Sequence, residues 1–316
     1  MKHAVLPLVA TALCIGGCAG VAARPDAGVK GLTETGAPAQ VSEQASMRDR
    51  LAVASADEGL RRGDAAYRAG RSEEAAYLYM QAAQLAPTDA APLIRLGVVQ
   101  EQKRNLPLAI RAYDMALARE PGNVVAADHL GLALAQTADV ARAKTVLQGL
   151  VDRGEASWHV HNALGVIAQR EGDAGAARAH FDAALEREPR AASVFNNRGY
   201  LRLLQGDLPG ARGDLETALA LGEGDRPRAN LGTVYARQGE YARALEVLLP
   251  TVPRPEALNR VGEAALKNGD YRAAYAFFER AAAASPTYFE RAHANMTVAE
   301  AHLEQAAAPP GTRPGG

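Results

Sequence analysis

Two pairs of residues combine a reactive side chain with a short spacing. His159 and His161 are separated by one residue, and Cys14 and Cys18 are the only cysteines of the chain. Two imidazoles on one helix can share a zinc ion when they lie on the same face, which needs a spacing of three or four residues. At a spacing of two, the rings point about 200° apart. The histidine pair therefore predicts no metal site.

The sequence also lacks the motifs of common catalytic and nucleotide-binding sites. It contains no HExxH, GxSxG or CxxC sequence and no phosphate-binding loop. The stretch 222–225 is rich in glycine but lies between two expected helices, so we interpret it as a linker. The carboxylates are scattered without an evident pair. We expect no catalytic residue, no metal and no cofactor, and we predict that the protein is not an enzyme.

The first eighteen residues have the pattern of an export signal. Residues 1–3 carry a basic side chain, residues 4–13 are apolar, and two glycines precede Cys18. The apolar run is shorter than the roughly 20 residues that cross a bilayer. One interpretation is an ordinary secretory signal that is cut within residues 19–23.

The other interpretation is a lipoprotein signal, because Ile15-Gly16-Gly17-Cys18 resembles the lipobox of bacterial lipoproteins. Cys14 fits less well, since bulky Leu13 stands where a small residue is needed. The resemblance implies that Cys18 becomes the first residue of the mature protein and carries three acyl chains, whereas one chain binds a membrane only marginally. Ala19, in place of an aspartate, favours the outer membrane under the enterobacterial sorting rule. We therefore predict lipidation at Cys18 and a lipid-anchored location in the bacterial cell envelope, at the outer membrane and facing the periplasm.

Residues 19–55 show no helical periodicity and contain many Gly, Pro, Thr and Ser residues. This composition is typical of a disordered tether, and a flexible chain of about 37 residues would have an r.m.s. length of about 30 to 37 Å. The tether would let the following domain stand off the membrane.

From residue 56 onward, the sequence repeats with a period of about 34 residues. Segment 161–190 shows small, aromatic and proline residues at fixed spacings: Leu164, Gly165, Ala168, Gly172, Ala177, Phe181, Ala184 and Pro189. One period later, the same spacings place Gly199, Gly206, Ala211, Leu215 and Ala218, and one period earlier Leu130, Gly131, Ala143, Leu147 and Leu150. The pattern resembles the tetratricopeptide (TPR) unit, in which a helix, a glycine turn and a second helix are followed by a proline.

This resemblance implies an all-α fold, a TPR solenoid that forms a right-handed superhelix of about seven helical hairpins plus a C-terminal capping helix. We predict a signal peptide at 1–17, the lipidated cysteine and tether at 18–55, the TPR array at 56–306 and a disordered tail at 307–316. The units are expected near 56–89, 90–123, 124–157, 158–191, 192–225, 226–254 and 255–288, with the cap at 289–306.

Each recurring residue type has a mechanical explanation. A glycine in the first helix lets the two helices of a unit touch, and a second glycine ends that helix in a left-handed conformation. Arg104 and Ala138 replace this second glycine, so we expect less regular turns there. One large residue of each second helix is expected to be core: Tyr79, Tyr113, Leu147, Phe181, Leu215, Leu248 and Phe278.

Composition agrees with a helical array and excludes one class of partner. Apolar residues make up 48% of the chain but aromatic residues only 5%, so burial must come mainly from Ala and Leu at close helix contacts. The net charge is −1, with 35 basic and 36 acidic residues and no long block of one sign. Non-specific nucleic-acid binding needs a basic stripe, so we predict no nucleic-acid partner.

The remaining candidate for function is a binding groove. In TPR proteins the first helices line the concave face, and the inward positions of this chain hold an unusual number of asparagines. A carboxamide offers both a donor and an acceptor, so these residues could hold a peptide backbone whatever its side chains. The alternative is that the asparagines cap or hydrate the helices. Acidic residues are interspersed, so the sign of the ligand is not predicted. The predicted groove residues are Asn162, Asn196, Asn197, Tyr200, Asn230, Asn259, Arg260, Arg95 and His129.

Three blocks give a narrower resemblance: residues 195–200, residues 228–232 with the short sixth unit, and residues 269–288. Together with the lipobox and tether they are similar to the TadD-type lipoproteins of tight-adherence (Flp) pilus systems. That resemblance implies a scaffold that binds a protein partner, such as a secretin or a pilus-assembly component, through a peptide segment or a helix. Two alternatives stay open: a lipoprotein like the type IVa pilus pilotins, or a scaffold that regulates cell-wall synthesis enzymes.

Overall fold

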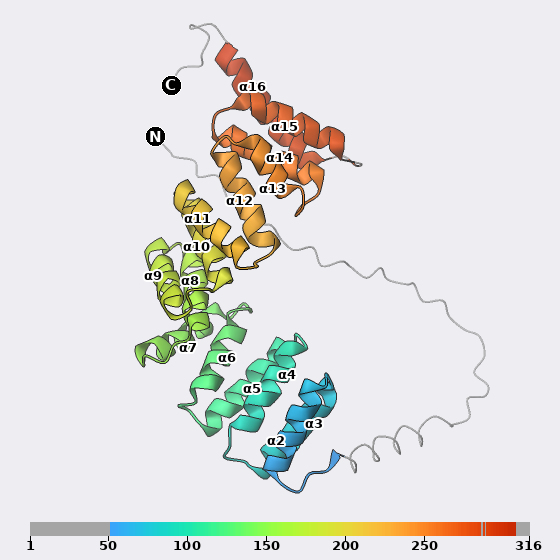
Figure 1. Cartoon of the computed structure of the whole chain (residues 1–316), viewed down its shortest axis with the longest axis vertical. Helices are drawn as coiled ribbons and strands as arrows, with labels where there is room; N and C mark the ends of the chain where they lie inside the picture. Colours follow the sequence, from blue (N-terminus) through green and yellow to red (C-terminus); the bar gives the residue numbers. More distant parts are fainter. Residues whose placement is uncertain (1–50, 286, 288, 308–316) are drawn as a thin grey trace, which may run out of the picture. The chain divides into compact units, whose positions relative to one another are not determined.

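The computed structural model describes residues 51–285, 287 and 289–307 (Figure 1). The predicted signal peptide, Cys18 and nearly all of the tether lie outside the described residues, as does the tail from residue 308 onward. The described residues form fifteen helices, labelled α2 to α16, and contain no strand. The prediction of an all-α fold is confirmed.

Consecutive helices pair into seven hairpins, and a final helix, α16 (Glu290–Ala307), follows the last of them. The hairpins are α2 (Ala56–Arg68) with α3 (Ser72–Leu85), α4 (Ala91–Gln102) with α5 (Leu106–Arg119), α6 (Val124–Leu134) with α7 (Val140–Asp152), α8 (Trp158–Glu171) with α9 (Ala174–Arg187), α10 (Ala192–Gln205) with α11 (Leu208–Ala220), α12 (Asp225–Arg237) with α13 (Tyr241–Leu248), and α14 (Arg254–Lys267) with α15 (Tyr271–Ala284).

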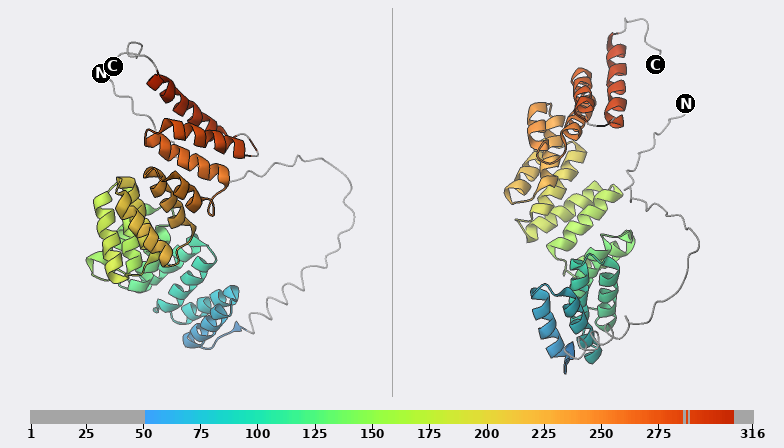
Figure 2. Two further views of the ribbon diagram at one scale, coloured as in Figure 1. Left: turned by 45° about the horizontal axis from the view of Figure 1, so that its top comes forward. Right: turned by 90° about the vertical axis from the view of Figure 1, so that its right-hand side faces the viewer.

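Each hairpin packs against the next (Figure 2). The second helix of a hairpin contacts the first helix of the following one, and from α4 onward the successive first helices also contact one another. Hydrophobic clusters therefore include residues of neighbouring hairpins, as in the cluster that joins Tyr113 of α5 to Leu130 of α6 and Leu147 of α7. No helix in the described part of the chain is both long and apolar enough to cross a membrane.

The two helices of every hairpin meet at a glycine. A Cβ atom added to Gly97 would lie 2.3 Å from Tyr113 Cε1, and one added to Gly165 would lie 2.6 Å from Phe181 Cε1. The large residue of each second helix thus occupies the space that the glycine leaves free. These large residues are at most 2% exposed, so the prediction that they are core is confirmed.

The two turns that lack the second glycine, at Arg104 and at Ala138, differ from each other in structure. Arg104 adopts a left-handed conformation with φ of 57°, as Gly172 does with φ of 83°. The expectation of an irregular turn at Arg104 is therefore wrong, because the backbone keeps the glycine geometry and accepts the strain of about 1 kcal/mol or more. At Ala138 the expectation is confirmed: α6 ends early, at Leu134, and Thr137 bonds back to that residue's carbonyl.

Candidate functional site

The asparagines of α8, α10 and α12 form a line of side-chain hydrogen bonds, which we call the asparagine ladder. Asn197 Nδ2 donates to Asn162 Oδ1 at 2.9 Å, and Asn196 Nδ2 donates to Asn197 Oδ1 at 3.2 Å. Asn230 Nδ2 then donates to Asn196 Oδ1 at 3.1 Å. Since a carboxamide is both donor and acceptor, one residue type can continue such a line across three helices. The ladder ties the first helices of the fourth, fifth and sixth hairpins together.

A second group of amides joins α14 to α16. Asn295 Nδ2 donates to Asn259 Oδ1 at 3.2 Å, and Asn259 Nδ2 donates to Glu263 Oε1 at 2.7 Å. Asn259 is fully buried and Asn196 is 7% exposed, so in this conformation their carboxamides cannot reach a ligand. Within the described chain, Asn162 Nδ2 and Asn230 Oδ1 have no hydrogen-bond partner, and they lie at the two ends of the ladder.

Three of the other predicted groove residues, Arg95, His129 and Arg260, lie on other hairpins and do not form one site with the ladder. Arg95 Nε pairs with Asp64 Oδ1 at 2.9 Å, and the same oxygen accepts a hydrogen bond from Tyr79. His129 Nδ1 lies 3.2 Å from Glu101 Oε2, and this hydrogen bond raises the pKa of His129. Both side chains are thus already partnered by carboxylates of the preceding hairpin.

At the far end of the array, Arg260 pairs with Glu256 at 2.8 Å. Tyr200 is 38% exposed on α10 and stands free for contact. The binding role of the whole set stays a prediction, and the structure gives most of its members a second role in joining hairpins.

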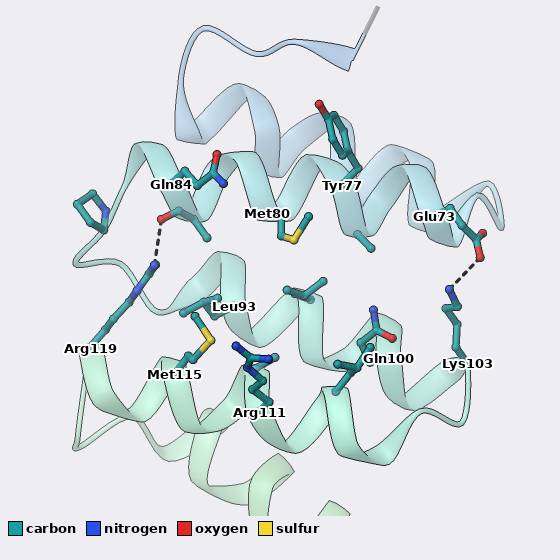
Figure 3. Close-up of a pocket in the computed structure, with 16 residues that line it drawn as sticks. Glu73, Tyr77, Met80, Gln84, Leu93, Gln100, Lys103, Arg111, Met115 and Arg119 are labelled. Atoms are coloured by element: carbon teal, nitrogen blue, oxygen red, sulfur yellow. Dashed lines mark hydrogen bonds and ion pairs between the residues drawn. The ribbon is translucent and has the colours of Figure 1, made fainter. Parts of the chain in front are cut away.

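A different surface has the form of a binding site. An apolar groove with a volume of about 780 Å³ lies between α3 and α5, with α4 at its base (Figure 3). Met80 of α3 and Met115 of α5 face the space between the helices, and Leu93 of α4 lies between them. Met80, Leu108 and Met115 are 45–48% exposed. We call this surface the α3–α5 groove.

Polar contacts mark both ends of the α3–α5 groove. At one end Lys103 Nζ pairs with Glu73 Oε1 at 2.8 Å. At the other end the guanidinium of Arg119 donates to the carbonyl oxygens of Ala83 and Asp89 at 3.0 and 2.8 Å. Arg111 points toward the opening from α5, and it has no hydrogen-bond or ion-pair partner among the described residues.

The repeat itself shows that this groove is unusual. One repeat later, Asp114 stands in place of Met80 and Arg142 in place of Leu108, and these two residues form an ion pair. The exposed apolar residues between α3 and α5 thus stand at the positions that form an ion pair between α5 and α7.

Further along the array, Lys144 of α7 pairs with Glu171 of α8 at 2.6 Å, an ion pair of the same kind as Lys103 of α4 with Glu73 of α3. Charges also cross the space between α9 and α11, where Arg198 of α10 bonds Asp182 and Asp214, each at 2.7 Å. These last three residues stand where Met80, Leu96 and Ala112 line the α3–α5 groove, three repeats earlier.

Sequence reasoning missed the α3–α5 groove because it read only the first helices for function. A signal was present: exposed positions of the second helices hold Met80, Leu108 and Met115 in two hairpins and charged or small residues at the equivalent positions of the next. Comparing these positions repeat by repeat would have identified the groove.

The described residues hold no group of three or more His, Cys, Asp or Glu side chains arranged for a metal. Among the residues that the structure describes, His161 and His180 form a close imidazole pair, with their Nδ1 atoms 3.3 Å apart. Burial, helped by Arg187 and His180, lowers the pKa of His161 to about 4. The pair is neutral at pH 7 and belongs to the packing between α8 and α9.

Comparison with known proteins agrees with the fold. The family model for the tetratricopeptide repeat matches residues 60–124, 167–226 and 229–289. No curated protein matches the chain. Similar solved structures include a tetratricopeptide repeat protein from Parabacteroides merdae, with 15% identity, a TM-score of 0.54, and coverage of 78% of this chain and 98% of that one.

Two further structures resemble the chain to a similar degree. A chain of the APC/C hetero-tetramer Cut9–Hcn1 has 16% identity and a TM-score of 0.55, covering 75% of this chain and 48% of that chain. PilF of Pseudomonas aeruginosa has 19% identity and a TM-score of 0.52, covering 72% and 98% respectively. At these identities the likeness concerns the fold alone.

Proposed function

The chain belongs to the tetratricopeptide repeat family, and on this basis we propose that it is a non-catalytic scaffold that docks a helix of a protein partner in the α3–α5 groove. The observation that carries the proposal is the open groove itself. Between α5 and α7 and between α9 and α11, ion pairs cross the equivalent space, whereas here Met80, Leu108 and Met115 stay exposed. Contiguous exposed apolar side chains mark sites of association.

The shape of the groove favours a helix as the ligand. Both flanking helices have fourteen residues, which corresponds to about 21 Å of length. A partner helix of similar length can lie along the space between them and insert its apolar side chains toward α4, in the helix-in-groove mode. The exposed methionines suit this role, because their unbranched side chains adapt to the shape of a ligand.

We further propose that the scaffold is attached to the outer membrane through lipidated Cys18 and assists assembly of a tight-adherence (Flp) pilus or a related secretion apparatus. The lipobox-like stretch 15–18 and the blocks at 195–200 and 228–232 support this assignment. A pilotin-like lipoprotein of type IVa pili and a regulator of cell-wall enzymes are the alternatives. The similarity to PilF does not favour the first of these, since Cut9 shares the same fold to the same degree.

Photo-crosslinking in the intact envelope tests the docking site. A benzoylphenylalanine at Met115 is expected to crosslink a helical segment of one partner, whereas the same group at exposed Thr145 of α7, which does not line the groove, is the control. The partner segment, made as a peptide, should bind the full chain. Binding should be lost when Met80→Asp and Leu108→Arg install the ion pair that the chain itself uses one repeat later.

An unchanged affinity in that double variant, with helicity intact, would contradict docking in the groove. The pilus assignment is tested separately by deleting the chain and scoring surface pili. Normal piliation together with altered sensitivity to cell-wall stress would support the cell-wall alternative. Cys18→Ser should release the protein from the membrane fraction if Cys18 carries the lipid.

A further inference from the structure

The charges around the α3–α5 groove are unbalanced. Three basic side chains and one acidic side chain line it: Lys103, Arg111, Arg119 and Glu73. The acidic group is already used, because Glu73 accepts a hydrogen bond from Lys103 at 2.8 Å, and this bond lowers the pKa of Glu73. Arg111 and Arg119 therefore remain without a carboxylate.

Arg119 is held in place but is not neutralised. Its guanidinium donates to the carbonyl oxygens of Ala83, Ala86 and Asp89, which are uncharged acceptors. These bonds use three of the five N–H groups that an arginine carries. The carboxylate of Glu120, next in the chain, accepts hydrogen bonds from Ala90 N and Asn123 Nδ2. Arg119 can thus still bind an anion.

Arginines at the corresponding surfaces of later hairpins do pair with carboxylates. Arg142 of α7 faces Asp114 of α5, and Arg198 of α10 faces two aspartates. Each of these arginines receives its carboxylate from within the chain. Arg111 lies on an open apolar groove and receives none, so a carboxylate of the molecule that fills the groove can pair with it.

Resting on the proposed docking function, we propose that the partner helix in the α3–α5 groove carries two carboxylates, seven or eight residues apart, that contact Arg111 and Arg119. Arg111 and Arg119 are eight residues apart on one helix, which places their backbones about 12 Å apart. Residues seven or eight apart on a partner helix lie on one face at nearly the same separation. The occupant is thus an acidic amphipathic helix whose apolar stripe is bordered by this pair.

Synthetic peptides test the charge requirement without knowledge of the partner. The probe is a fluorescent eighteen-residue helix with a leucine stripe and two glutamates seven residues apart. Matched peptides carry glutamine or lysine at the same two positions. Their binding to the full-length protein is measured by fluorescence anisotropy at low and physiological salt.

The glutamate peptide is expected to bind about two- to fivefold more tightly per carboxylate than the glutamine peptide, and the lysine peptide most weakly. The difference should shrink as salt is added, because exposed charges are screened. Arg111→Gln should remove the preference at one position and leave the glutamine peptide unaffected. Exposed Arg170→Gln, on α8, is the matched control and should change nothing.

The possible failures are distinguishable. Equal binding of all three peptides, lost in the Met80→Asp, Leu108→Arg variant, would overturn the charge requirement and leave docking in the groove intact. Equal or no binding to the native protein and to that variant would overturn both. Binding to phosphatidylglycerol vesicles but to no peptide would also overturn the proposal, and would identify the groove as a contact for anionic lipid.

Discussion

The contribution of the ion pairs between α9, α10 and α11 to stability can be tested quantitatively. Asp214 is 4% exposed. Its two oxygens accept hydrogen bonds from Arg198 Nη2 at 2.7 Å and Arg198 Nε at 2.9 Å, and Arg202 pairs with it at 2.9 Å. Bonding to Asp214 is also the leading cause of the raised pKa of Arg198. Asp214→Ala would leave a largely buried guanidinium with only one carboxylate.

The expected cost of Asp214→Ala is about 3 kcal/mol of unfolding free energy, the lower end of the range for breaking a buried pair. The lower end applies because Asp182 still bonds Arg198, at 2.7 Å. Asp182→Ala alone should cost about 1 kcal/mol or less, since its side chain is 43% exposed.

A triple variant separates the ion pairs from the packing. Asp182→Met, Arg198→Leu and Asp214→Ala together copy the residues that line the α3–α5 groove, three repeats earlier. Apolar residues can replace a buried ion cluster with little loss, and Arg202, which also loses Asp214, is 30% exposed and keeps Asp207 nearby. The triple variant should therefore be within about 1 kcal/mol of the native stability. Its hairpins would then have an apolar groove of their own.

Urea unfolding followed by tryptophan fluorescence measures these values locally. The chain has a single tryptophan, Trp158, which begins α8 and packs against the hydrophobic cluster that contains Phe181 and Leu201. A local probe is needed because repeat arrays do not unfold as one unit. The reasoning would be refuted if Asp214→Ala cost less than about 1 kcal/mol, or if the triple variant were as unstable as that single variant.

Three further predictions concern the packing of the array. Asn196→Ala should lower stability by about 1 to 3 kcal/mol, because it interrupts the ladder and leaves the partly buried amide groups of Asn197 and Asn230 without these bonds. Asn162→Ala, at the end of the ladder, should cost less in the same urea titration. Arg104→Gly should raise stability by about 1 kcal/mol, because φ is 57° there, and Arg104→Ala, which keeps the Cβ atom, should not. Since the pKa of His161 falls from 6.5 to about 4 on folding, the unfolded chain binds its proton first, and stability should fall by up to about 1.4 kcal/mol per pH unit below pH 6.5. His161→Phe should weaken this pH dependence in urea titrations at pH 7, 5.5 and 4. If the pH dependence of the His161→Phe variant equals that of a variant at exposed His159, His159→Gln, the prediction is contradicted.

The helices were predictable because local signals agree with the fold. The repeated glycine and the large residue sixteen positions later, such as Gly97 with Tyr113, specify both the hairpin and its internal contact. Arg104 was misjudged because the rule that glycine takes left-handed positions is a preference. An exposed turn can bear strain of about 1 kcal/mol when the surrounding packing fixes the backbone.

The asparagines show that the partner of an inward-facing residue cannot be predicted from the sequence of one helix alone. Asn196 and Asn230 occupy equivalent inward positions of neighbouring hairpins, so their side chains lie close enough to bond each other. A pattern that marks such a residue as inward-facing does not say whether its partner is a ligand or the next repeat. Only the distance between hairpins decides this.

The distribution of these contacts assigns different tasks to different hairpins. From α8 to α12 the asparagine ladder and the Arg198 ion pairs give neighbouring helices directional bonds, which resist sliding of one hairpin on the next. Between α3 and α5 no such bond crosses the centre of the groove, and the exposed methionines contribute contact area without fixing a geometry. Met80 and Leu108 stand where Asp114 and Arg142 form an ion pair one repeat later. Because an exposed ion pair adds little stability, this difference matters mainly for which molecule the surface can bind, and an apolar surface fits the helix that we propose.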